Sequence, residues 1–123
     1  MQNSFKGKTG LKRLWNAFFY TKAGLQAAYK HEDAFRTEVV LAAILIPAAF
    51  FMPTTGIGKA LMIASVLLVL IVELLNSALE AAVDHTSLAE HALAKRAKDI
   101  GSAAVFISLV MVVAVWALVL LGK

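Results

Sequence analysis

The sequence predicts an all-α membrane protein in which three transmembrane helices follow an amphipathic helix at the membrane surface. Hydrophobic residues make up 60% of the 123 residues and charged residues only 16%, whereas about a quarter of a soluble domain is charged. Residues 100–121 contain no charged side chain, and ~20 apolar residues are enough to span the hydrocarbon as a helix. Two further apolar segments precede this one. The length suits a single membrane domain covering residues 1–123.

The N-terminal part predicts a polar tail over residues 1–10 and an amphipathic helix over 11–31. Most apolar side chains of the helix fall on one face, and most of its polar side chains fall on the other. The apolar set is rich in aromatic residues and the polar set in Lys and Arg, which is typical of a helix lying in the membrane interface. The alternative is an amphipathic helix packed on the protein's own core, but the chain offers little soluble protein for it to cover.

Three spans are predicted at residues 35–53, 57–83 and 100–121. The first is short, because its purely apolar part covers only residues 39–52. The polar segment 84–99 joins the second span to the third. Ser87 and Glu90 within it have the spacing of a capping box, which predicts a helix that runs through Lys95, Arg96 and Lys98 into the third span.

The distribution of Lys and Arg predicts the orientation. Seven of the 12 lie before the first span or at its start, and three lie in the 84–99 loop. Of the other two, Lys59 lies near the turn between the first and second spans, and Lys123 is at the C-terminus. Positive residues are enriched in cytoplasmic loops, so the N-terminus and the 84–99 loop should be cytoplasmic in an inner-membrane protein. The net charge of +4 is therefore expected to favour binding to lipid headgroups and not to nucleic acid.

A polar stripe on the second span is the main functional signal. At ~100° per residue, five polar side chains fall within an arc of roughly 100°: Glu73, Asn76, Ser77, Glu80 and Asp84. Acidic residues within a span are costly and usually functional. Polar contacts between helices could explain Asn76 and Ser77, but they explain two carboxylates on one stripe poorly.

The stripe predicts acid–base and metal chemistry at the lipid–water boundary. A carboxylate near lipid, Glu73, could accept a proton from a substrate hydroxyl. A carboxylate nearer the cytoplasm, Glu80, could bind Mg²⁺, which uses one or two carboxylates together with substrate phosphates. Glu32 could supply the second carboxylate. Lys98 and Asp99 could contact the phosphate and the ribose or purine of a nucleotide. With no cysteine in the chain, thiol catalysis is excluded.

The run from Glu73 to Asp84, ELLNSALEAAVD, resembles the signature of the prokaryotic diacylglycerol kinase family. Supporting positions are Glu32, Phe35, Arg36 and Glu38 before the first span, and the segment from Arg96 to Val105 entering the third. The resemblance extends from about Arg13 to Trp116. It implies a homotrimeric helical bundle with sites shared between subunits, which transfers the γ-phosphate of ATP to diacylglycerol with Mg²⁺ and gives phosphatidic acid.

The resemblance also implies roles for individual residues. Glu73 matches the catalytic base, and Glu32 and Glu80 match the magnesium ligands. Positions on the nucleotide side are Arg13, Tyr20, Glu32, Glu80, Glu90, His91, Lys98 and Asp99. Positions on the lipid-substrate side are Arg13, Phe35, Arg36, Glu38, Glu73, Asn76 and Ser102.

Three other functions remain open from the sequence. A branch of the same family phosphorylates undecaprenol, although the well-formed amphipathic helix favours diacylglycerol. A small proton-coupled transporter would use Glu73 as its coupling carboxylate, but such proteins commonly have four spans. A structural assembly subunit would leave Glu32, Glu80 and Asp99 without roles.

Overall fold

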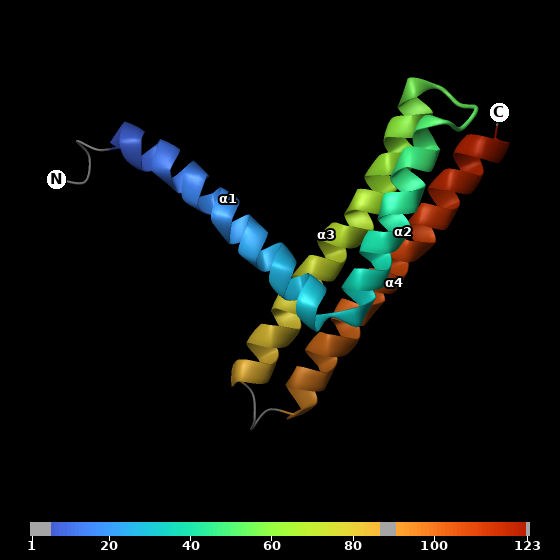
Figure 1. The fold of residues 1–123 in the computed structure, drawn as a ribbon. Helices are drawn as coiled ribbons and strands as arrows, with labels where there is room; N and C mark the ends of the chain where they lie inside the picture. The colour runs from blue at the N-terminus through green and yellow to red at the C-terminus, as the bar shows by residue number, and fades with distance from the viewer. Residues whose placement is uncertain (1–5, 87–90, 123) are drawn as a thin grey trace.

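The computed structural model describes residues 6–86 and 91–122, and these form four α-helices. They are α1 (Lys6–His31), α2 (Asp33–Phe50), α3 (Gly56–Thr86) and α4 (His91–Leu121). Figure 1 shows α2, α3 and α4 as a bundle, with α1 diverging from it. The all-helical prediction is confirmed.

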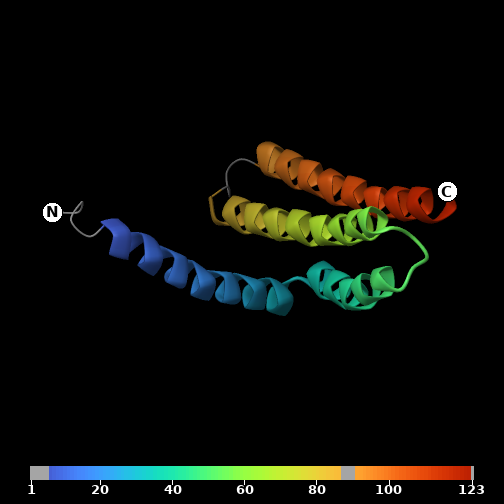
Figure 2. The ribbon, with the colours of Figure 1, turned by 90° about the horizontal axis from the view of Figure 1, so that it is seen from above.

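Helix α3 is the centre of the bundle. It packs against both α2 and α4, and Figure 2 shows it lying between them. The contact with α2 is close because Ala42 and Ala49, seven residues apart on one face, are both buried, and small residues let helices approach in membranes. Met62 of α3 is fully buried, and its carbonyl oxygen accepts a hydrogen bond of 3.2 Å from Nε1 of Trp116 in α4.

Two helices are long and apolar enough to cross a membrane among the described residues, namely α3 and α4. Helix α2 has 18 residues and carries Asp33, Arg36 and Glu38 near its start, so its apolar part is short. The span at residues 35–53 therefore stays a prediction. Helix α4 buries little of its surface within the chain, which leaves its apolar side chains for lipid or for neighbouring subunits.

The helix ends differ from the predicted ones in two places. Helix α1 begins at Lys6, so residues 6–10 belong to the helix and not to the predicted tail. Once a helix has formed, adding residues at its end costs little free energy. The connection is shorter than residues 84–99, since α3 continues to Thr86 and α4 begins at His91. The predicted helix through Lys95, Arg96 and Lys98 into the third span is confirmed by α4. Lys, Arg, Glu and Ala are good helix formers, so charge in this segment did not exclude helix. The capping-box pair Ser87 and Glu90 lies outside the described residues.

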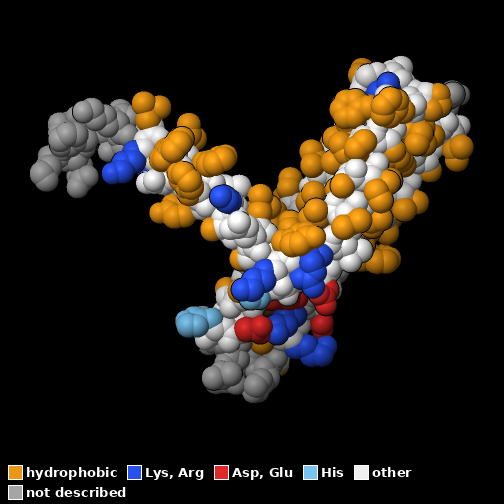
Figure 3. Space-filling model, in the orientation of Figure 1, with side chains coloured by type: hydrophobic (Ala, Val, Ile, Leu, Met, Phe, Trp, Pro, Cys, Tyr) orange, Lys and Arg blue, Asp and Glu red, His pale blue; other side chains and the backbone are white. Residues whose placement is uncertain are grey.

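Charged side chains gather at one end of the bundle. Figure 3 shows most Asp, Glu, Lys and Arg side chains near the end where α1 meets the other helices, and apolar side chains over much of the remaining surface. Helix α1 also exposes large apolar groups, including Leu14, Trp15 and Phe18. This distribution suits a protein whose polar end meets water while its apolar surface meets lipid.

Candidate functional site

The polar stripe of α3 consists of Glu73, Asn76, Ser77, Glu80 and Asp84. These residues share a face because α3 is a continuous helix from Gly56 to Thr86. Its N-terminal part packs apolar side chains such as Val66 and Val69 into the bundle, and Glu73 continues that buried side, being only 5% exposed. The stripe then becomes more exposed toward Asp84. It therefore leads from the bundle interior to the charged end.

Glu73 meets a second carboxylate, Glu38 of α2. The two carboxyl groups are close enough to interact electrostatically, and Oε1 of Glu38 is buried without a hydrogen-bond partner. Glu38 also lines an apolar cavity of about 200 Å³ between α2, α3 and α4. The pair thus places two carboxyl groups beside an apolar space.

Asn76 connects the stripe internally and to α4. Its Nδ2 donates a hydrogen bond of 3.4 Å to Oε2 of Glu80. Its Oδ1 is buried without a hydrogen-bond partner and lies where a Cβ on Gly101 would be. Only glycine at position 101 therefore lets α4 pack against this amide.

An ion pair joins the far end of the stripe to α4. Nζ of Lys98 lies 2.6 Å from Oδ1 of Asp84, with both side chains partly exposed. One turn away, Nζ of Lys95 lies 2.7 Å from Oδ2 of Asp99 on the surface of α4. The cation of Lys98 is thus held at the water-facing end of the stripe, where Glu80 also acts on it.

A groove of about 530 Å³ separates α1 from α3 beside the stripe. Its lining includes Glu32 from the end of α1, and Ser77, Ala78 and Ala81 from α3. Glu80 belongs to the same stretch of α3 and is half-buried, but its side chain does not line the groove. Carboxylate oxygens are ligands that Mg²⁺ prefers, in small numbers and together with phosphates, so Glu32 and Glu80 fit this ion. No group of three or more His, Asp or Glu side chains suited to a metal occurs in the described part of the chain, so further ligands would come from substrate or water.

Other predicted site residues are not brought to the stripe. Arg13 and Tyr20 are exposed on α1, and Arg13 belongs to its N-terminal half. Ser102 is exposed on α4. Phe35 is only 3% exposed, and Arg36 is bonded to the end of α1. Glu90 lies outside the described residues, and nothing is described of the side chain of His91.

Two contacts that shape the site could not be predicted from the sequence. Asp84 was part of the stripe, but its ion pair with Lys98 joins positions that are distant in sequence. Gly101 allows α4 to pack closely on α3, because a Cβ at this position would overlap the side chain of Asn76. The identity of its neighbour, Asn76, could not be read from spacing.

Comparison with known families gives one match over most of the chain. The sequence profile of the family described as "Prokaryotic diacylglycerol kinase" matches residues 19–120. This range contains the whole stripe, Glu32, Glu38 and Lys98, whereas Arg13 precedes it.

Similar proteins carry the same description. A diacylglycerol kinase of Pseudomonas aeruginosa is 55% identical over 118 residues, which cover 96% of each chain. One of Haemophilus influenzae is 54% identical over 108 residues, covering 88% of this chain and 92% of the relative. One of Escherichia coli K12 is 44% identical over 112 residues, covering 91% and 92%.

Proposed function

The chain belongs to the prokaryotic diacylglycerol kinase family, and on that premise we propose that it transfers the γ-phosphate of ATP to diacylglycerol, giving phosphatidic acid. The observation that best supports this reaction is the buried carboxylate of Glu73 at the inner end of a stripe that opens toward water. A lipid alcohol stays in the bilayer and ATP stays in water. The reacting groups can therefore meet only at the boundary between them, where this stripe lies.

Glu73 is the proposed general base. It accepts the proton of the lipid hydroxyl as that oxygen forms a bond to the γ-phosphorus, while the bond from phosphorus to the bridging oxygen breaks and ADP leaves with the electron pair. A base placed near the attacking hydroxyl is a recurring part of phosphoryl transfer. Glu38 and Asn76 border Glu73 on either side and are the proposed groups that orient the lipid hydroxyl. The apolar cavity beside Glu38 suits the adjoining hydrocarbon.

Glu32 and Glu80 are the proposed ligands of Mg²⁺. The ion would neutralise charge on the transferring phosphates. Both side chains are half-buried, and Glu32 lines the groove between α1 and α3, which suits an ion shared with a phosphate chain. Lys98, held by Asp84 at the outer end of the stripe, supplies positive charge for the nucleotide phosphates.

The nucleotide side is proposed to include further residues. Asp99 lies beside Lys98 on α4, and the remaining proposed contacts are Arg13, Tyr20, Glu90 and His91. Ser102, one turn farther along α4, is a proposed contact of the lipid substrate. The proposed assembly is a homotrimer in the inner membrane, with the N-terminus and the residues between α3 and α4 facing the cytoplasm.

The deciding experiment is a phosphate-transfer assay with the purified protein in mixed micelles. Labelled ATP and Mg²⁺ are supplied with diacylglycerol in one reaction and undecaprenol in another. We expect labelled phosphatidic acid, with much slower transfer to undecaprenol. Faster transfer to undecaprenol would assign the chain to the other branch of the family. Proton flux in proteoliposomes without ATP, and no transfer to either alcohol, would favour a transporter.

A further inference from the structure

A single residue separates α1 from α2. Glu32 lies between them with extended backbone angles, φ −118° and ψ 107°. Its N–H donates to the carbonyl of Ala28, at 2.9 Å, and its carbonyl accepts from the N–H of Arg36, at 3.1 Å. The hinge between the two helices is thus the same residue that is proposed to bind Mg²⁺. Any rotation of α1 about this point would move the Glu32 carboxylate.

Little besides the junction holds α1 in place. Helix α1 packs chiefly against α2, and the groove of about 530 Å³ lies between it and α3. Its N-terminal half extends away from the bundle (Figures 1 and 2). The direction of α1, and with it the position of Glu32 relative to the stripe, therefore depends on the contacts at the junction.

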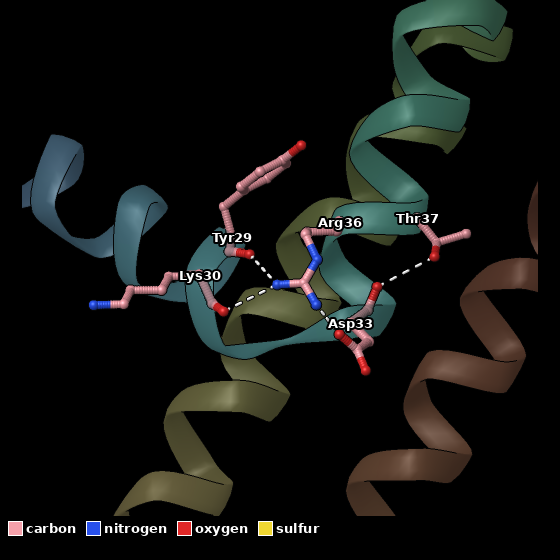
Figure 4. A network of polar contacts seen from close by, with 5 residues as sticks. All are labelled: Tyr29, Lys30, Asp33, Arg36 and Thr37. Carbon is pink, nitrogen blue, oxygen red and sulfur yellow. Dashed lines mark hydrogen bonds and ion pairs between the residues drawn. The ribbon is translucent and has the colours of Figure 1, made fainter.

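Arg36 makes those contacts, as Figure 4 shows. Its Nη1 donates hydrogen bonds to the carbonyl oxygens of Tyr29, at 2.6 Å, and Lys30, at 2.9 Å. Its Nη2 forms an ion pair with Asp33. The last carbonyls of a helix lack intrahelical partners, and a cation at this end is also favoured by the helix dipole. One guanidinium therefore ties the last turn of α1 to the first turn of α2.

We propose that Arg36 is a positioning residue that, by capping the end of α1, fixes the Glu32 carboxylate beside the polar stripe and so sets the site's affinity for Mg²⁺. This inference rests on the proposed role of Glu32. It gives Arg36 a different task from the lipid contact that the resemblance implies, because the guanidinium already has three acceptors on two helices. Lysine cannot reproduce this planar, branched set of donors.

The first test measures the direction of α1 without metal or substrate. The chain contains no cysteine, so Lys22→Cys and Leu75→Cys provide two exposed spin-label positions, one on α1 and one on α3. Labelled chains are diluted with unlabelled chains, so that the distances come from within one chain. We expect one narrow distance distribution in the parent and a broad one after Arg36→Ala.

Lys30→Ala is the matched control. It removes a cation from the same junction but leaves the Lys30 carbonyl that Arg36 uses. Its distance distribution should equal that of the parent, and Arg36→Lys should be intermediate. An unchanged distribution in Arg36→Ala would overturn the inference, whatever the activity of that variant.

The second test measures the initial rate as a function of Mg²⁺ concentration. Loss of a group that orients a metal ligand typically weakens metal affinity by about 10- to 100-fold, so Arg36→Ala should raise the half-saturating Mg²⁺ by that factor. The maximal rate at high Mg²⁺ should fall much less, and Lys30→Ala should match the parent. A higher KM for diacylglycerol at unchanged Mg²⁺ dependence would instead make Arg36 a lipid contact. Absence of kinase activity in the parent counts against the proposed function, while the distance measurement still decides whether Arg36 holds α1.

Discussion

Glu73, the proposed general base, occupies an energetically costly position. An acidic residue within a membrane helix costs on the order of 2.5–3.5 kcal/mol, and this one is almost fully buried. Glu73→Gln keeps the size of the side chain but cannot take the hydroxyl proton. Turnover should fall by about 10²- to 10⁴-fold, the usual contribution of a general base, as measured by phosphate transfer at saturating ATP.

Glu73→Asp serves as the companion variant. It retains a carboxylate but withdraws it by one methylene, so its activity should lie between those of the parent and Glu73→Gln. The oligomeric state of all three proteins is compared by gel filtration. A Glu73→Gln protein that assembles normally and turns over at the parental rate would remove Glu73 from the reaction.

Lys98 offers a second test, at the water-facing end of the stripe. Hydrogen bonds to charged groups contribute more than neutral ones, so loss of a phosphate contact should raise the KM for ATP by about tenfold in Lys98→Ala. The KM for diacylglycerol should change little, since the proposed lipid site is at the other end of the stripe. Both constants come from initial rates at varied ATP and varied lipid.

Lys95→Ala is the control for this change. Lys95 lies one turn away on the same helix and pairs with Asp99 at the surface, where ion pairs contribute little. Its KM for ATP should stay close to that of the parent. Equal effects of the two substitutions would mean that general positive charge, and not Lys98 itself, attracts the nucleotide.

The stripe could be predicted because one helix repeats its face every 3.6 residues. Glu73, Asn76 and Glu80 therefore followed from spacing alone. The partner of Glu73 could not be predicted in this way, since Glu38 reaches it from another helix. The Lys98–Asp84 pair and the capping of α1 by Arg36 depend on tertiary packing, and the second also uses backbone carbonyls that a sequence pattern does not distinguish.

The packing of α4 on α3 supplies a prediction about helices. A Cβ at position 101 would overlap the amide of Asn76, so Gly101→Ala must push that side chain or the whole helix aside. Overpacking typically costs about 1–3 kcal/mol. We expect a lower melting temperature in detergent, together with a larger relative loss of activity, because Asn76 adjoins both Glu73 and Glu80.

Gly10→Ala is the matched control in α1. A Cβ there would meet nothing within 4 Å, and alanine favours helix over glycine by about 1 kcal/mol. Its melting temperature should be unchanged or slightly higher, with parental activity. If Gly101→Ala behaved in the same way, Asn76 would not depend on the close approach of α4.

Hydropathy predicted the interiors of the helices better than their ends. The apolar parts of α3 and α4 are strong signals because lipid requires long runs without charge. The ends of α1, α3 and α4 extend into polar sequence, where helix formation depends on propensity and on pairs such as Lys95–Asp99 rather than on hydropathy. The direction of α1 was not predictable, since it is set by the backbone at Glu32 and by the bonds of Arg36.

The arrangement of the whole chain suggests that one subunit does not complete a site. The stripe lies within the bundle, but α1 carries Arg13 away from it (Figure 1). Roughly five turns of helix, ~28 Å, separate Arg13 from the hinge at Glu32. If Arg13 contacts the nucleotide, it therefore does so at the stripe of a neighbouring subunit, as the proposed homotrimer allows.

Mixing two inactive variants tests this arrangement. Arg13→Ala and Glu73→Gln chains are purified, mixed in equal amounts and allowed to exchange subunits. If Arg13 and Glu73 of one site come from different subunits, about a quarter of the sites combine two intact residues in a randomly mixed cyclic oligomer. Activity should then rise toward that fraction of the parental value, as measured by phosphate transfer.

A control mixture of Asn76→Ala and Glu73→Gln should stay inactive, because both residues belong to one stripe. Recovery in the control alone would contradict the shared site, and no recovery in the test mixture would place Arg13 and Glu73 of each site on the same chain.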